Sequence, residues 1–143
     1  MLISKTFKWD AAHRLPKHQA KCRHLHGHTY TMTVEFEGNI NDEGMVIDFG
    51  EIRKILTPYI DQLDHTTIIC KDDTELLEIF QQKAWRHFLL PYDSTAENLC
   101  RYFSTLLIQN HQHFLRENGI TAIGIKIYET ETSCAYLHTQ VEV

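Results

Sequence analysis

Two segments of the chain alternate between apolar and polar residues, with the two-residue period of a β-strand that is buried on one face. In residues 2–13 the polar side includes Lys8 and Asp10. The apolar side of the same segment carries Phe7, Trp9, Ala11 and His13. In residues 26–37 the apolar side carries His26, His28, Tyr30, Met32, Val34 and Phe36. We therefore expect two strands, each with one face toward a core.

Two longer segments have apolar residues at the spacing of amphipathic helices. The first covers about residues 51–63, and the second covers residues 97–114 and is expected to stop at Gly119. Residue pairs that resemble capping boxes precede both helices: Asp48 with Glu51, and Ser94 with Glu97. Between the two helices we expect a short helix from about residue 74 to 82, and then extended chain to Leu90.

The end of the chain returns to strand patterns. Ile123, Ile125 and Ile127 share one side of a third strand with Glu129, and residues 134–143 form a fourth. Strands that bracket helices predict an α+β fold, with a four-stranded antiparallel sheet and helices on one face. The length of 143 residues, with 43% hydrophobic residues, predicts one domain over residues 1–143.

Composition narrows the function classes. A net charge of −5 argues against general nucleic-acid binding, and no apolar run is long enough to span a membrane. The first ten residues do not resemble a signal peptide, and the four cysteines are scattered, so we expect reduced thiols and a cytoplasmic location. The region from residue 11 to 34 contains no acid, and it carries Arg14, Lys17, Lys21 and Arg23. This basic stretch is either a site for a small anion or a solvated loop.

The sequence C-R-H-L-H-G-H, residues 22–28, holds the strongest candidate for chemistry. His26 and His28 are two residues apart on a predicted strand and therefore point the same way, toward the apolar side. His13 lies on the apolar side of the other strand, so pairing of the two strands would bring three imidazoles together. Three histidines with an open fourth position are typical of a catalytic zinc site. The alternative is a set of core histidines held by hydrogen bonds.

Other residues carry weaker signals. Cys22, beside a metal and basic side chains, would have a lowered pKa and could serve as ligand, nucleophile or base; otherwise it is a small buried apolar residue. Asp64 and His65 are adjacent and suit proton transfer, although a helix-end cap explains them equally. Glu129 on an apolar side needs a partner, such as a ligand with two N–H groups, unless a bulge turns it outward.

Five motifs together resemble one family. They are F-K-W-D-A-A-H-R-L-P, C-R-H-L-H-G-H, L-D-H, S-T-A-E-N-L and Y-E-T, in that order and over nearly the whole chain. The chain thus resembles the 6-pyruvoyl-tetrahydropterin synthase superfamily, which has the tunnelling fold. The spacing C-x-x-x-H-G-H is similar to that of its bacterial 6-carboxy-tetrahydropterin synthase branch.

The resemblance implies a role for each motif. Zinc would bind His13, His26 and His28, and Cys22, Asp64 and His65 would be catalytic. Glu129 would anchor a pterin, and Thr95 and Glu97 would border its pocket across a subunit boundary. The implied reaction converts 7,8-dihydroneopterin triphosphate to 6-carboxy-5,6,7,8-tetrahydropterin, with release of acetaldehyde and triphosphate, toward queuosine. The family implies a homohexamer in which sheets join into a barrel.

Two alternative functions remain open from the sequence. The neighbouring pyruvoyl branch has the same fold and substrate but only eliminates triphosphate. A non-catalytic metal-binding or pterin-binding module would need the histidines and Glu129 but would not need Cys22 or His65.

Overall fold

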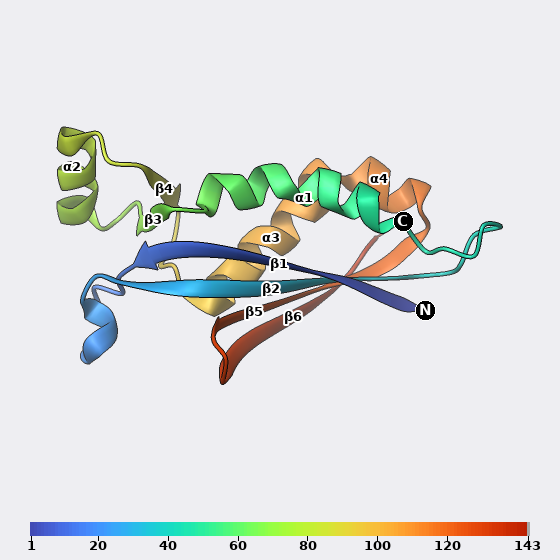
Figure 1. Cartoon of the computed structure of the whole chain (residues 1–143), viewed down its shortest axis with the longest axis horizontal. Helices are drawn as coiled ribbons and strands as arrows, with labels where there is room; N and C mark the ends of the chain where they lie inside the picture. The colour runs from blue at the N-terminus through green and yellow to red at the C-terminus, as the bar shows by residue number, and fades with distance from the viewer. Residues whose placement is uncertain (143) are drawn as a thin grey trace.

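A single mixed sheet organises the molecule in the computed structural model, which describes residues 1–142. The sheet has six strands in the order β4-β3-β1-β2-β5-β6 (Figure 1). Four strands pair in antiparallel fashion: β1 (Leu2–His13), β2 (His26–Gly38), β5 (Ile120–Thr130) and β6 (Ser133–Gln140). The remaining two, β3 (Thr66–Cys70) and β4 (His87–Leu90), extend the β1 edge in parallel orientation. The α+β class is confirmed, but the expected four-stranded antiparallel sheet is wrong, since two parallel strands were missed.

The missed strands lack the alternation on which strand prediction depends. All five residues of β3 are buried, and its sequence T-T-I-I-C does not alternate between polar and apolar residues. Parallel strands covered on both faces typically have such continuous apolar runs. The strand β4 corresponds to part of the predicted extended chain, but with four residues it is too short to show a period. The alternating pattern therefore predicts strands that have one solvent-exposed face, and it does not predict β3 or β4.

Helices cover one face of the sheet (Figure 1). The elements are α1 (Phe49–Leu63), α2 (Thr74–Lys83), α3 (Ala96–Asn110) and α4 (Gln112–Glu117). The predicted long helix is two helices, because the chain leaves helical geometry at His111, while its apolar stripe continues into α4. Gly119 ends this region at φ 63°, as expected for a left-handed stop.

Helix caps differ in one place from the prediction. The Asp48 side chain accepts a hydrogen bond from the Gly50 N–H and caps α1 as expected. At α3 the cap is Thr95 rather than Ser94, since the Thr95 hydroxyl accepts from the Asn98 N–H at 3.1 Å. Ser94 is thereby released for another contact, described below.

The core lies between the helices and the apolar face of the sheet. Trp9 pairs with Tyr30 across β1 and β2, and the rings stack with centroids 5.2 Å apart. Further along the same face the pairs become polar, ending with His13 opposite His26. The histidines thus lie at one end of the core. Within residues 1–142 no helix combines the length and the apolar character needed to cross a bilayer.

Candidate metal centre and the adjoining pocket

Three histidines converge where β1 ends and β2 begins. His13 pairs with His26 in the register, and His28 lies one step along the same face, opposite Ala11. One ring nitrogen of each histidine lies within 4.8 Å of those of the other two. The convergence predicted from residue parity is therefore confirmed as geometry.

Hydrogen bonds orient two of the three rings. The Nδ1 of His13 lies 2.9 Å from the Ser94 carbonyl and 3.1 Å from the Ser94 hydroxyl. The Nδ1 of His26 lies 2.7 Å from the His24 carbonyl. Because a carbonyl only accepts, Nδ1 carries the proton in both rings, and each Nε2 keeps a free lone pair. A contact of this kind behind a histidine is the usual support for a metal ligand.

Burial favours the neutral form of two of the three rings, those of His13 and His28. The pKa of His13 is lowered to about 4, chiefly by burial; the Ser94 contact opposes this shift, and the nearby His26 and His28 add to it. Burial also lowers the pKa of His28. Neutral imidazole is the form that binds a metal ion.

The environment of His28, the third histidine, also favours metal binding. His28 Nε2 is buried without a hydrogen-bond partner among residues 1–142. Leaving a buried polar nitrogen unpaired is costly, and a metal–nitrogen bond removes that cost. Three imidazoles, two of them oriented through Nδ1, fit a divalent ion such as zinc with protein ligands at three positions.

Glu129 reaches this centre from β5. Its Oε1 lies 3.9 Å from the Nε2 of His13, and its side chain is 28% exposed. Because His13 is neutral at pH 7, this approach is not an ion pair. Burial raises the pKa of Glu129, and the nearby Glu97 raises it further. The strand register shifts beside Glu129, between Tyr128 and Thr130, but the bulge does not turn the side chain away from the site.

A small pocket adjoins the centre and collects the other predicted binding residues. It has a volume of about 160 Å³. Its walls include Thr95, Glu97 and Glu129, together with Leu15, Ser133 and Cys134. Two carboxylates in one partly buried pocket favour a ligand that offers N–H groups.

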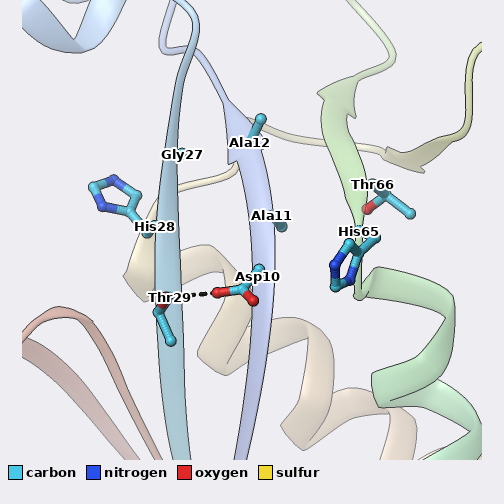
Figure 2. A pocket seen from close by; sticks show the side chains of 8 residues that line it. All are labelled: Asp10, Ala11, Ala12, Gly27, His28, Thr29, His65 and Thr66. Atoms are coloured by element: carbon cyan, nitrogen blue, oxygen red, sulfur yellow. Dashed lines mark hydrogen bonds between the residues drawn. The ribbon is translucent and has the colours of Figure 1, made fainter.

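Asp64 and His65 lie elsewhere. Their side chains approach to 3.0 Å, and the Asp64 carboxylate accepts a hydrogen bond from the Asp10 N–H at 2.9 Å. That bond, helped by His65, lowers the pKa of Asp64. Figure 2 shows the His65 ring beside β1 and the His28 ring beyond β2, at the rim of an open depression of about 420 Å³. Over residues 1–142 no hydrogen bond or ion pair joins this pair to the three histidines.

The loop between β1 and β2 carries Cys22 in a short 3₁₀-helix, η1 (Lys21–Arg23). Cys22 is half-buried, and its carbonyl accepts a hydrogen bond from the Leu15 N–H, which closes the loop. It does not join the metal-binding group of three histidines. Cys22 is therefore close to His26 along the chain, but within residues 1–142 it is not part of the histidine cluster.

Acidic side chains of the same chain already contact part of the basic stretch. Arg14 forms two hydrogen bonds with Asp73, at 2.7 and 2.6 Å. Lys17 lies 3.6 Å from Asp93. Arg14 is therefore a structural residue, and Lys21 and Arg23 stay the better candidates for an anion.

Sequence reasoning missed two residues of the site. Ser94 was interpreted as a cap, but it orients His13 across 81 residues of chain, a contact for which no local pattern exists. The pattern places Tyr30 in the core, and its hydroxyl is buried with no hydrogen-bond partner among residues 1–142, while its ring lies 5.5 Å from that of His28. The signal for Tyr30 was present in its parity, since it shares the side of His26 and His28.

Known proteins resemble this chain over most of its length. A family model described as 6-pyruvoyl tetrahydropterin synthase matches residues 2–140. The 6-carboxy-5,6,7,8-tetrahydropterin synthase of Haemophilus influenzae is 34% identical over 143 residues, covering 94% of this chain and 96% of that protein. The protein of the same name from Rickettsia conorii is 32% identical over 130 residues, covering 89% and 92%.

Solved structures resemble the fold. The 6-pyruvoyl tetrahydropterin synthase of Plasmodium falciparum superposes with a TM-score of 0.77 at 22% identity, covering 99% of this chain and 98% of that one. An uncharacterized protein from Wolinella succinogenes gives the same TM-score and identity, covering 98% of each chain. At this identity the likeness concerns the fold.

Proposed function

From the premise that the chain belongs to the 6-pyruvoyl tetrahydropterin synthase family, we propose that it is a lyase acting on 7,8-dihydroneopterin triphosphate. The product is 6-carboxy-5,6,7,8-tetrahydropterin, with acetaldehyde and triphosphate released. The names of the bacterial relatives support this product, and so does the C-x-x-x-H-G-H spacing of residues 22–28. The reaction serves the synthesis of queuosine and related deazapurines in the cytoplasm.

One observation carries the proposal. Three histidines that fit a metal ion lie beside a pocket lined by two carboxylates. Such a pair of features suits a ligand with an N–H edge at one end and oxygen atoms at the other, which describes a pterin with a hydroxylated side chain.

His13, His26 and His28 would hold zinc. When bound, zinc acts as a Lewis acid that acidifies the side-chain hydroxyl and carbinol C–H groups of the substrate. The Nδ1 contacts of His13 and His26 keep these two rings in the tautomer that leaves Nε2 for the ion.

Glu129 would anchor the pterin by accepting two N–H bonds from its amide and amino edge. Its raised pKa reflects burial, and a bidentate pair of donors would offset the cost of that burial. Thr95 and Glu97 would border the same pocket, with Thr95 also capping α3.

Cys22 would act as the base, and Asp64 with His65 would transfer protons. Asp64 holds the His65 imidazole at 3.0 Å, which suits a proton-transfer pair. Since no hydrogen bond or ion pair within residues 1–142 joins this pair to the three histidines, a complete site would need the pair of a neighbouring copy. That need supports a homo-oligomer, with a hexamer as the family expectation.

A product assay tests the proposal. Zinc-loaded protein is incubated with 7,8-dihydroneopterin triphosphate, and acetaldehyde and pterin mass are followed together. Acetaldehyde with a carboxy-tetrahydropterin is the expected result. A pyruvoyl product without acetaldehyde would move the protein to the neighbouring branch of the family.

A substitution separates the enzyme from a binding module. Cys22→Ala should abolish turnover while pterin and zinc still bind, because Cys22 is not among the metal-binding residues. Cys70→Ala is a control that removes a buried thiol elsewhere. Full turnover by Cys22→Ala would remove the assigned base.

A further inference from the structure

Tyr30 has a feature that the core packing does not explain. The residue is fully buried, and its hydroxyl has no hydrogen-bond partner among the residues described. A buried hydroxyl without a partner destabilises the folded chain, and phenylalanine would fill the same space without that cost. The hydroxyl therefore calls for an acceptor that is engaged in the functional state.

The neighbours of Tyr30 limit which group that acceptor is. Its ring centroid lies 5.2 Å from Trp9, 5.5 Å from His28 and 6.0 Å from His13. An indole N–H only donates, so Trp9 cannot accept from the tyrosine. The free lone pairs of His13 and His28 are the ones that fit the metal ion.

Glu129 is the remaining strong acceptor. The β2–β5 ladder ends with Met32 opposite Ile127 and Thr31 opposite Tyr128, and Tyr30 and Glu129 are the next residues along the two strands. Both side chains are on the core face, since Tyr30 is buried and Glu129 approaches His13. A tyrosine hydroxyl carries its proton at pH 7 and can donate it to a carboxylate oxygen.

We infer that Tyr30 is a positioning residue that donates a hydrogen bond to the Glu129 carboxylate when that carboxylate binds the N–H edge of the pterin. A hydrogen bond from Tyr30, on the core side of Glu129, would hold the carboxylate in one orientation, with its free oxygen lone pairs facing the pocket. This inference rests on the proposed pterin ligand and deepens it, because it adds a residue that selects the orientation of the ligand.

The test measures binding of neopterin, which has the pterin ring but no triphosphate, to the metal-loaded full-length protein by fluorescence. Tyr30→Phe should weaken binding about tenfold, the usual worth of a hydrogen bond to a charged group. Its metal content should not change, and its melting temperature should stay equal or rise, because an unpaired hydroxyl is removed. Tyr102→Phe is the matched control, since Tyr102 packs in the core against Phe88 and Phe103.

A double-mutant cycle shows whether Tyr30 acts through Glu129. In a Glu129→Gln background, Tyr30→Phe should have little further effect on the affinity for neopterin. Additive losses, a wild-type affinity in Tyr30→Phe, or an equal loss in Tyr102→Phe would overturn the inference while the proposed function stands. A wild-type protein that does not bind neopterin would count against the pterin ligand itself and thereby against both.

Discussion

The protein holds its three candidate ligands in different ways. His13 is fixed by the carbonyl and hydroxyl of Ser94, and His26 by the carbonyl of His24. His28 has a buried Nε2 that lacks a protein partner within the described chain. The sequence predicted the three residues because strand parity is a local property. It could not predict Ser94, since that contact spans 81 residues.

Metal content should depend on the His26 ring but not on the His24 ring. His26→Ala removes one of three ligands, so we expect the folded protein to lose most of its zinc after dialysis. His24→Ala is the matched control, because His24 supports His26 through its main-chain carbonyl. Elemental analysis measures the zinc content of both variants, and circular dichroism checks that both are folded. Equal zinc in His26→Ala and the wild type would contradict the assigned ligand set.

The Arg14–Asp73 pair gives a pH-dependent prediction. Arg14 holds the pKa of Asp73 below its usual value, so the pair stabilises the fold above the unfolded pKa and is lost as the pH falls through the folded one. Asp73→Asn should cost about 2 kcal/mol at pH 7, since it removes a charged hydrogen-bond acceptor. Urea denaturation from pH 7 toward pH 3 should show the difference from the wild type shrinking. A difference that is independent of pH would exclude the charge as its cause.

At the scale of elements, prediction succeeded where one face is solvated. The strands β1 and β2 carry an alternating pattern, and their predicted limits agree closely with the structure. The strand β3 is buried throughout, so only its tertiary neighbours distinguish it from other apolar runs. The break between α3 and α4 was missed because Leu107 and Leu115 continue one apolar stripe across it.

Thr95 should contribute to the stability of α3. Its hydroxyl accepts from the Asn98 N–H, so Thr95→Ala should lower the free energy of unfolding by about 1 kcal/mol. Thr95→Ser keeps the acceptor and should retain most of that stability. Chemical denaturation of the two variants without ligand checks the cap apart from any role in the pocket. Equal losses in both variants would argue that the methyl group, rather than the cap, is responsible.

At the scale of the whole molecule, one sheet face lacks helices in the part of the chain described, and β4 and β6 are its two edges (Figure 1). Two different free edges can pair head to tail, and repeated pairing closes a ring. Asp64 and His65 lie beside β1 on its β3 side, whereas His26 and His28 lie on β2 on its other side, which suits a site completed by a neighbouring copy.

Mixed assemblies should test that shared site. His26→Ala and His65→Ala should each be inactive alone. If equal amounts are unfolded and refolded together, roughly a quarter of the sites would combine an intact histidine cluster with an intact Asp64–His65 pair of a neighbour. Turnover that returns in the mixture, and not when the folded variants are merely combined, is the expected result. No recovery after co-refolding, with the assembly size of the wild type restored, would place all the residues of each site in one chain.

The contact between His13 and Ser94 has a thermodynamic consequence. It ties the end of β1 to the residue that precedes the cap of α3, so an ion on the three histidines joins the sheet to the helix layer. The unfolded chain cannot offer that arrangement, and by mass action the ion stabilises the fold by about 2.7 kcal/mol at roughly 100 times its dissociation constant. Melting temperature should therefore rise with free zinc in a calorimetric titration and stay flat in His26→Ala. The abundance of the folded enzyme would then follow the metal supply of its cell, with depletion acting on the population of the protein as well as on its chemistry.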